Sequence, residues 1–278
     1  MNTRRRVVLA LGAGAFAPFA SFAQQQGKVW RVGFLSQRHL DLVDTNNTYG
    51  GFTQGMRELG YVVGKNLVIE WRSAEGKAER LPEPALELVR LKVDILVTTG
   101  TPPSIAAQKA TTTIPIVMLY LTDPVGDGLV KSRARPGGNS TGLSNMNAEL
   151  GPKLLELLRG MAPKVTRVAA LVNPTNTSNT LVLKNIQAAA RKVGVTIHAV
   201  DANTPQEIAN AFAEMARQNA KALIVLQDGL YLQQLNQIVD LAAAQRLPSI
   251  GPWSEYVEAG GLISYGQNNW ENPRRAAT

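Results

Sequence analysis

Short apolar runs rich in β-forming residues alternate with segments of helical periodicity from residue 29 onward, and no other feature restricts the fold as much. Residues 29–35 form such a run, which leads through a polar loop into a predicted helix over residues 48–59 that ends at Gly60. Buried strands separated by helices require crossover connections, and these produce parallel sheets. The other predicted strands are residues 67–71, 93–98, 114–119, 167–172, 195–200, 222–226, 248–250 and the β-like piece 261–265. Further helices are predicted at residues 81–91, 102–110, 151–161, 179–193, 205–218 and 230–244, with a short terminal helix from Asn272.

One segment, residues 121–145, interrupts this alternation. It is rich in Gly, Pro and Asn, which favour turns, and we interpret it as a lobe edge or crossover. The alternation restarts after it, and a length of 278 residues exceeds that of a usual single domain. We therefore predict an α/β protein of two doubly wound parallel-sheet lobes with a ligand cleft between them. The predicted lobes are residues 24–145, with a return segment at about 265–278, and residues 146–264.

The first 23 residues have the features of a signal peptide. Arg4, Arg5 and Arg6 precede an apolar stretch, and no acidic residue occurs before Asp41. Small residues at the two positions that a signal peptidase reads predict cleavage between Ala23 and Gln24, and hence export to the periplasm. An N-terminal membrane anchor is the alternative interpretation. The arginines also match a twin-arginine signal in part, so the export route stays open.

Composition and missing motifs argue against an enzyme. The chain has no Cys and two His, which excludes a thiolate metal site and makes a zinc site or a His-based triad hard to build. It lacks the Gly-x-Ser-x-Gly elbow, the phosphate loop, and a Gly-x-Gly-x-x-Gly turn after the first strand. We therefore expect no catalytic residues, no metal and no cofactor. The net charge of +8 includes three signal arginines, and the other basic residues are scattered, which predicts no nucleic-acid partner.

Candidate ligand residues lie in the loops that follow the predicted strands, because ligands of open parallel sheets bind beyond the carboxyl ends of the strands. These loops are Ser36-Gln37-Arg38, Thr99-Gly100-Thr101, Thr122-Asp123, residues 173–176, Gln227-Asp228-Gly229 and Gly251-Pro252-Trp253. Helix N-termini suit a carboxylate, and Asp123 or Asp228 could hold an ammonium group. The competing interpretation is that the Ser, Thr and Asn residues only cap helices.

Several segments together resemble the ABC-transporter substrate-binding proteins of the periplasmic binding protein type I fold, and are most similar to the branch with tryptophan- and tyrosine-binding proteins. The most specific signal is the run from Arg135 to Asn139 followed by Thr141-Gly142. The other matching segments are VGFL (32–35), FTQGMRELGYVVG (52–64), VIEWR (68–72), DILVTTG (94–100), IPIV (114–117), residues 123–144 as a whole, LLELL (154–158), VNP (172–174) and PSIGPWSEYVEAGGLIS (248–264).

The resemblance implies ligand loops at Thr99-Gly100-Thr101, at Asn173 with Ser178, and at Asp228, whose carboxylate would hold a ligand ammonium group. Our full set of expected ligand-binding residues is Ser36, Gln37, Thr99, Gly100, Thr101, Asp123, Asn173, Thr175, Ser178, Gln227 and Asp228. The sequence Leu226-Gln227-Asp228-Gly229 departs from the commoner Thr-Asp-Asn form, so the ligand class stays open. Relatives continue past Thr278 with another strand and helix, which leaves open whether the second lobe is complete.

The function that the resemblance implies is solute capture for an ABC import system. A monomer would close its two lobes on a small solute, an amino acid or an aromatic or carboxylate compound, and deliver it to a membrane permease and its ATPase. One alternative is a periplasmic ligand-sensing module for a receptor or kinase. A secreted α/β enzyme is a further alternative, against which the missing Gly-rich turn argues.

Overall fold

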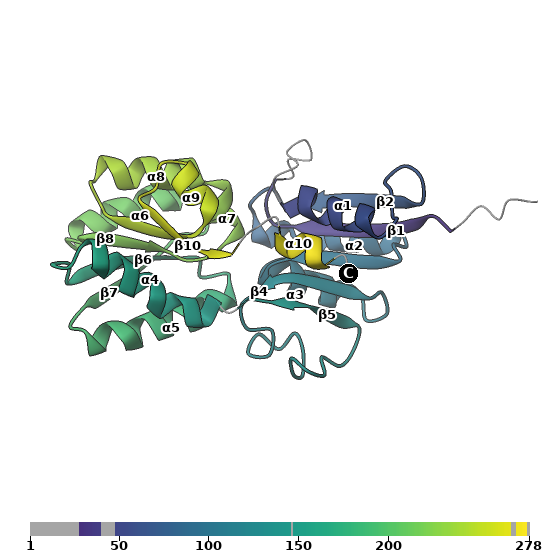
Figure 1. The fold of residues 1–278 in the computed structure, drawn as a ribbon, viewed down its shortest axis with the longest axis horizontal. Helices are drawn as coiled ribbons and strands as arrows, with labels where there is room; N and C mark the ends of the chain where they lie inside the picture. The colour runs from purple at the N-terminus through teal and green to yellow at the C-terminus, as the bar shows by residue number, and fades with distance from the viewer. Residues whose placement is uncertain (1–27, 40–47, 146, 268–270, 277–278) are drawn as a thin grey trace, which may run out of the picture.

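The computed structural model describes residues 28–39, 48–145, 147–267 and 271–276, and these form two α/β lobes (Figure 1). Each lobe is built on a sheet of five parallel strands among the described residues. The predicted fold class is therefore confirmed. The predicted signal peptide, residues 1–23, lies outside the described residues.

The N-terminal lobe has the strand order β2-β1-β3-β4-β5. In this order the bounds are β2 (Leu67–Ser73), β1 (Trp30–Ser36), β3 (Ile95–Thr99), β4 (Ile116–Leu121) and β5 (Ser140–Ser144). Its helices are α1 (Thr48–Glu58), α2 (Pro82–Arg90) and α3 (Thr101–Ala110), with a short 3₁₀ turn at Ala78–Arg80. Phe34 in β1 pairs with Trp71 in β2 and Val97 in β3, so the centre of this sheet is apolar.

The C-terminal lobe has the strand order β10-β9-β8-β6-β7. The strands are β6 (Arg167–Val172), β7 (Thr196–Asp201), β8 (Ala222–Val225), β9 (Ser249–Trp253) and β10 (Ile263–Gln267). The helices are α4 (Asn147–Met161), α5 (Thr177–Lys192), α6 (Pro205–Arg217), α7 (Gly229–Gln233), α8 (Leu235–Ala244) and α9 (Ser254–Glu258). Val168 and Ala170 pack with α4 and α5 on one face of the sheet, while Ala169 and Leu171 pack with α6 and α8 on the other. Because helices cover both faces, β6 reads as one continuous apolar run.

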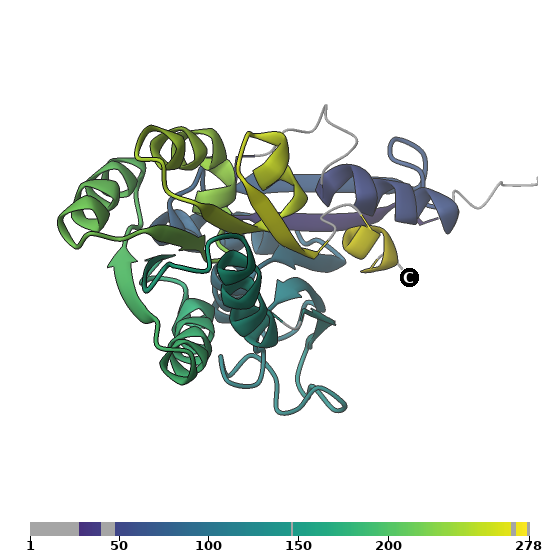
Figure 2. The same ribbon diagram turned by 60° about the vertical axis from the view of Figure 1, so that its left-hand side comes forward.

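The chain returns to the first lobe at its C-terminal end. β10 pairs with β9 in the second sheet, whereas α10 (Glu271–Ala276) packs against α1 in the N-terminal lobe (Figures 1 and 2). An ion pair between Arg274 Nη1 and Glu58 Oε2, at 2.8 Å, joins these two helices. The segment that we expected to return thus includes a helix that lies on the first lobe.

Three predicted elements need correction. The segment 121–145 contains β5, an edge strand of small and polar residues that carries no apolar pattern. The helix predicted over residues 151–161 would have Pro152 in its first turn, but α4 begins at Asn147 and contains Pro152 in its interior. At Gly151 an added Cβ would lie 2.9 Å from Ile186, so this part of α4 packs closely on α5.

The predicted helix 230–244 is divided at Gln234 into α7 and α8, and α9 was not predicted.

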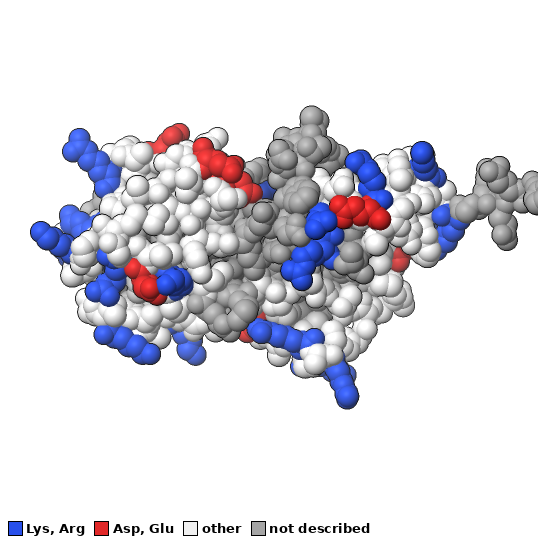
Figure 3. Space-filling view, viewed as in Figure 1, with Lys and Arg blue, Asp and Glu red and all other residues white. Residues whose placement is uncertain are grey.

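Charged side chains are spread over both lobes. On the face drawn in Figure 3, Lys and Arg side chains occur on both lobes, and Asp or Glu side chains lie beside some of them. Within the described ranges, no helix combines the length and the apolar character that crossing a bilayer requires.

Candidate functional site

The two lobes meet through hydrogen bonds between loops at the carboxyl ends of their strands. Thr101, at the start of α3, and Ser178, in the first turn of α5, have their hydroxyl oxygens 2.7 Å apart. The Asp127 carboxylate accepts hydrogen bonds from Thr177 Oγ1 at 2.6 Å and from Ser178 Oγ at 3.0 Å. Asp127 belongs to the N-terminal lobe and α5 to the C-terminal lobe, so these contacts hold the lobes in a closed arrangement.

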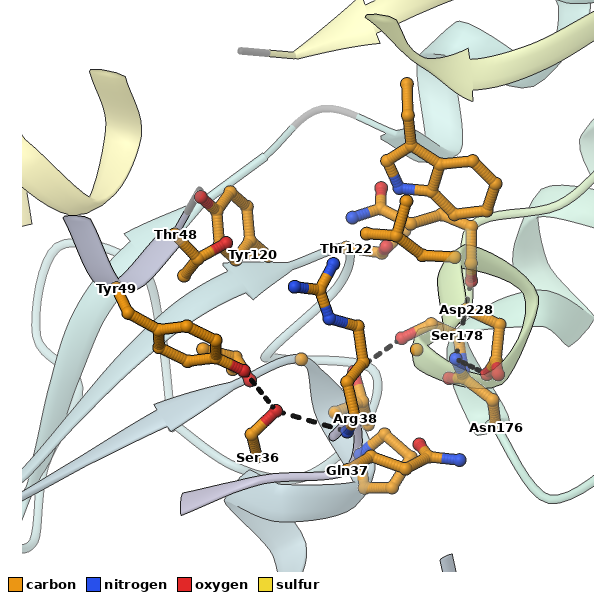
Figure 4. Close-up of a pocket in the computed structure, with 18 residues that line it drawn as sticks. Ser36, Gln37, Arg38, Thr48, Tyr49, Tyr120, Thr122, Asn176, Ser178 and Asp228 are labelled. Atoms are coloured by element: carbon orange, nitrogen blue, oxygen red, sulfur yellow. Dashed lines mark hydrogen bonds between the residues drawn. The ribbon is translucent and has the colours of Figure 1, made fainter. Parts of the chain in front are cut away.

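A cavity of about 70 Å³ lies between the lobes at this meeting point (Figure 4). It is formed by loops that follow β1, β3, β4, β6, β8 and β9, as expected for parallel sheets whose carboxyl ends face each other. The lining residues are Ser36, Gln37, Arg38, Thr48, Tyr49, Thr99, Gly100, Thr101, Pro102, Tyr120, Thr122, Asn176, Ser178, Gln227, Asp228, Gly229, Leu232 and Trp253.

The structure places eight of the eleven expected ligand residues in this lining and three outside it. The eight are Ser36, Gln37, Thr99, Gly100, Thr101, Ser178, Gln227 and Asp228. Asp123 forms a turn within its own loop, where its Oδ1 accepts a hydrogen bond from the Gly126 backbone N–H at 3.0 Å. Asn173 Oδ1 accepts from the backbone N–H and the hydroxyl of Thr175, at 3.0 and 2.7 Å. These three side chains are engaged in local turns, in line with the capping interpretation.

Ten lining residues were not singled out from the sequence. Five lie in the predicted loops, namely Arg38, Thr122, Asn176, Gly229 and Trp253, and the other five are Thr48, Tyr49, Pro102, Tyr120 and Leu232. The sequence could have indicated Thr48 and Tyr49, because the helix that follows a parallel strand begins at the carboxyl end of the sheet, where the cavity lies. Tyr120 has φ of 61°, a backbone conformation that no sequence pattern indicated.

Asp228 is the carboxylate in the cavity lining, and it is 3% exposed. Its Oδ1 accepts from the Leu230 backbone N–H at 2.8 Å and so caps α7, and its Oδ2 accepts from Asn176 Nδ2 at 2.9 Å. The Asn176 side chain also caps α5, because its Oδ1 accepts from the Ser178 N–H at 3.2 Å. Burial raises the pKa of Asp228 above its usual value, and the hydrogen bond from Asn176 opposes this rise. A cationic or donor group beside Asp228 would therefore be favoured electrostatically.

Aromatic side chains enclose the cavity on both lobes. Tyr49 packs edge-on against Phe34, with ring centroids 5.2 Å apart, and donates its hydroxyl to Ser36 Oγ at 3.1 Å. Burial raises the pKa of the Tyr120 phenol, so this side chain is neutral at physiological pH. Trp253, at the end of β9 in the C-terminal lobe, also lines the cavity, which thus combines apolar ring surface with hydroxyl, amide and charged groups.

The described His, Asp and Glu residues are spread apart. In the part of the chain that the structure describes, no three His, Asp or Glu side chains come close enough together to hold a metal ion. His39 forms an exposed pair with Glu75, with Nδ1 and Oε2 2.8 Å apart.

Comparison with known proteins gives a consistent assignment of family. The family described as ABC transporter substrate binding protein matches residues 42–278. A tyrosine-binding protein from Clostridioides difficile (strain R20291) is 28% identical over 216 residues, which are 78% of this chain and 62% of that protein. The chain thus spans less than two thirds of the length of this curated relative.

Solved structures show the same fold. A conserved domain protein from Vibrio cholerae has a TM-score of 0.83 and 27% identity, over 90% of this chain and 83% of that one. An ABC domain in complex with L-Trp from Streptococcus pneumonia has a TM-score of 0.81 and 25% identity, over 89% of this chain and 82% of that one. A substrate binding protein with adhesive properties from Clostridium difficile, in a ligand-free, open structure, is also 25% identical. The match covers 89% of this chain and 84% of that one, but the TM-score is only 0.55. The lower score at equal identity agrees with the closed arrangement seen here.

Proposed function

Because the chain belongs to the family of ABC transporter substrate-binding proteins, we propose that it is the periplasmic solute-binding component of an ABC import system. It captures an amino acid or an aromatic or carboxylate compound between its lobes and delivers it to a membrane permease with its ATPase. Closure is favoured by contacts that exist only in the closed state, since a solute shifts the equilibrium by its differential affinity for the two states.

The observation that carries this proposal is the buried Asp228 in a cavity between two lobes. A buried carboxylate without a cationic partner is costly, and a solute ammonium group would lower that cost. A solute that lacks the groups matching the cavity would leave buried polar atoms unpaired, which gives selectivity. The tyrosine-binding relative and the L-Trp complex support an amino-acid solute. A second solute-binding structure, from Rhodopseudomonas palustris with 3,4-dihydroxy benzoic acid, shares the fold at 16% identity.

Thermal melting of the purified chain against a solute panel tests this proposal. The panel contains the twenty amino acids, benzoate, hydroxybenzoates and small amides. A solute at about 100 times its dissociation constant stabilises the folded protein by roughly 2.7 kcal/mol. For a protein of this size the expected rise in Tm is on the order of 5–10 °C. A selective rise with one chemical class supports the proposal, and an unchanged Tm across the amino acids and aromatic acids refutes it.

Export and transport need separate experiments. We expect the protein in a periplasmic extract to begin at Gln24, which N-terminal sequencing checks. We also expect a monomer by light scattering, and solute uptake that is lost when the partner permease is deleted. Uptake that persists without any permease, together with altered signalling by a receptor or kinase, would favour the sensing alternative.

The family's solute-binding role also supports the expectation that the chain has no catalytic activity.

A further inference from the structure

One side chain in the cavity lining is cationic, and no described residue binds its charged group. Arg38 is the cationic residue among the described lining residues, and its guanidinium group extends into the cavity (Figure 4). No ion pair or side-chain hydrogen bond joins this guanidinium group to another described residue, although Asp228 lines the same cavity. This guanidinium group is half-buried, and because no described residue binds it, it favours an anionic ligand group, to which it can donate two parallel hydrogen bonds.

The backbone and the first part of the Arg38 side chain contact both lobes. Its backbone N–H donates to Ser36 Oγ at 3.1 Å, and that oxygen also accepts from the Tyr49 hydroxyl. Arg38 Cγ lies only 3.5 Å from the point that a Cβ on Gly229 would occupy. The aliphatic part of Arg38 therefore runs along the opposite lobe, next to the residue that follows Asp228. The guanidinium group is held at the lobe interface, where a bound solute would meet it.

Carboxylates of the protein already bind at the starts of three helices beside the cavity. Helix N-termini attract carboxylates, and α3, α5 and α7 all begin beside the cavity. At α3 and α5, Asp127 Oδ2 accepts from Thr101 Oγ1 at 3.2 Å and from Ser178 Oγ at 3.0 Å. At α7, Asp228 itself caps the helix. A solute carboxylate that replaced these acceptors would have to displace Asp127 or Asp228, whereas the Arg38 guanidinium group offers donors that no described residue uses.

We propose that Arg38 binds the carboxylate of the solute while Asp228 binds its ammonium group, so that the cavity selects solutes carrying both charges. This inference rests on the proposed function, because it names the chemical class of solute for the same cavity. It also assigns the two charges to opposite lobes, Arg38 to the N-terminal one and Asp228 to the C-terminal one. A zwitterionic solute would then bridge the lobes and stabilise their closure.

Calorimetric titration with matched probes tests this assignment. The probes are L-tyrosine, tyramine, which lacks the carboxylate, and 3-(4-hydroxyphenyl)propionate, which lacks the ammonium group; the matching tryptophan series serves as a second set. We expect each truncated probe to bind wild-type protein about 10- to 100-fold more weakly than its parent amino acid. Arg38→Gln should weaken the parent amino acid by a similar factor and leave tyramine or tryptamine unchanged, while Arg38→Lys should restore part of the loss.

The outcomes separate this inference from the proposed function. If wild-type protein binds no solute of the thermal-melting panel, the proposed function fails and the inference fails with it; if the panel identifies a different amino acid, that amino acid and its forms without the carboxylate or the ammonium group replace the tyrosine series. If L-tyrosine or L-tryptophan binds but Arg38→Gln has no effect, or weakens parent and amine equally, only the assignment of Arg38 is overturned. Arg191→Gln removes the same charge from the exposed end of α5 and should change neither affinity. If Arg38→Gln does not fold, the ratio of the affinity for the parent amino acid to that for its amine is compared between wild type and Arg38→Lys. A lower ratio in Arg38→Lys supports the assignment of Arg38, and an equal ratio overturns it.

Discussion

At the scale of single residues, the most family-specific motif of this chain serves the fold and not the cavity. Gly137 and Gly138 have φ of 71° and 75°, which L side chains rarely adopt. Asn139 Nδ2 donates to the carbonyl oxygen of Ile114 at 2.7 Å and so fixes the entry to β5. Gly142 has φ of 153°, and a Cβ there would lie 2.0 Å from the Met118 carbonyl oxygen. The motif is required because β5 can pair with β4 only with these backbone geometries.

Gly142→Ala should lower the free energy of unfolding by about 2–4 kcal/mol, because the new methyl group would clash with the backbone of β4. Gly160→Ala is the matched control, since it lies in α4 with open space around the position of a Cβ. It should raise the free energy of unfolding by roughly 0.5–1 kcal/mol. Urea denaturation of both variants measures this, and equal effects would contradict the account of the motif.

Asp228 should make stability depend on pH. A carboxyl group whose pKa is raised in the folded state binds its proton more tightly there than in the unfolded chain. Its contribution to the free energy of unfolding therefore falls as pH rises from near the ordinary value of 3.8 through the raised folded pKa. The Tm of Asp228→Asn relative to wild type should rise over this window, by a few degrees.

Asp240→Asn, an exposed position on α8, is the control and should show no such trend. A difference in Tm between Asp228→Asn and wild type that stays constant from pH 3.5 to pH 7 would mean that burial of the Asp228 carboxyl does not control stability.

At the scale of helices and strands, side-chain caps decide where the helices around the cleft begin. Asn176 caps α5, Thr204 caps α6 and Asp228 caps α7, each by accepting a hydrogen bond from a backbone N–H of the first turn. At α5 and α7 the same side chains also line the cavity. The capping and ligand-binding interpretations of these loop residues are therefore compatible, because one polar side chain can satisfy a helix end and face the cleft.

Thr204→Ala should destabilise the protein by about 0.5–2 kcal/mol without affecting solute affinity, since α6 lies away from the cavity. Thr204 Oγ1 accepts from the Glu207 N–H at 3.1 Å, and the Glu207 carboxylate accepts from the Asn203 N–H at 2.8 Å. Thr166→Ala removes an exposed hydroxyl that caps no helix and should have little effect. Denaturant titration compares the two variants, and similar losses for both would count against the cap.

At the scale of the whole molecule, the relative position of the lobes is set by a few polar contacts. Asp127 is central to them, because its two carboxylate oxygens bind hydroxyl groups at the start of α3 and of α5. A second contact lies near the cavity, where Asn145 Nδ2 donates to Gln227 Oε1 at 3.4 Å. Such contacts are lost when the lobes separate, so they determine how much of the population is closed.

Asp127→Asn should shift the equilibrium toward the open form, since it weakens charge-assisted hydrogen bonds worth about 1–2 kcal/mol together. This corresponds to roughly a 5- to 30-fold rise in the ratio of open to closed molecules. Small-angle scattering of the solute-free protein should report a larger radius of gyration. Asp123→Asn removes the same charge four residues away, where the carboxylate binds only its own loop, and should leave the radius unchanged. Equal radii for both variants would show that Asp127 does not hold the lobes together.

The amino-acid sequence by itself determined the two-lobe α/β architecture, because apolar periodicity specifies each strand and helix locally. The order of elements then places the loops that contain Ser36, Thr99 and Gln227 at the carboxyl ends of the strands of their sheets. Only the tertiary structure decided which loop residues face the cavity and which complete their own turns, as Asn173 does. The pairing of Asp127 with Thr177, fifty residues apart, depends on how two separately folded lobes meet. Local periodicity carries no information about that meeting, since it is set by side-chain contacts across the cleft.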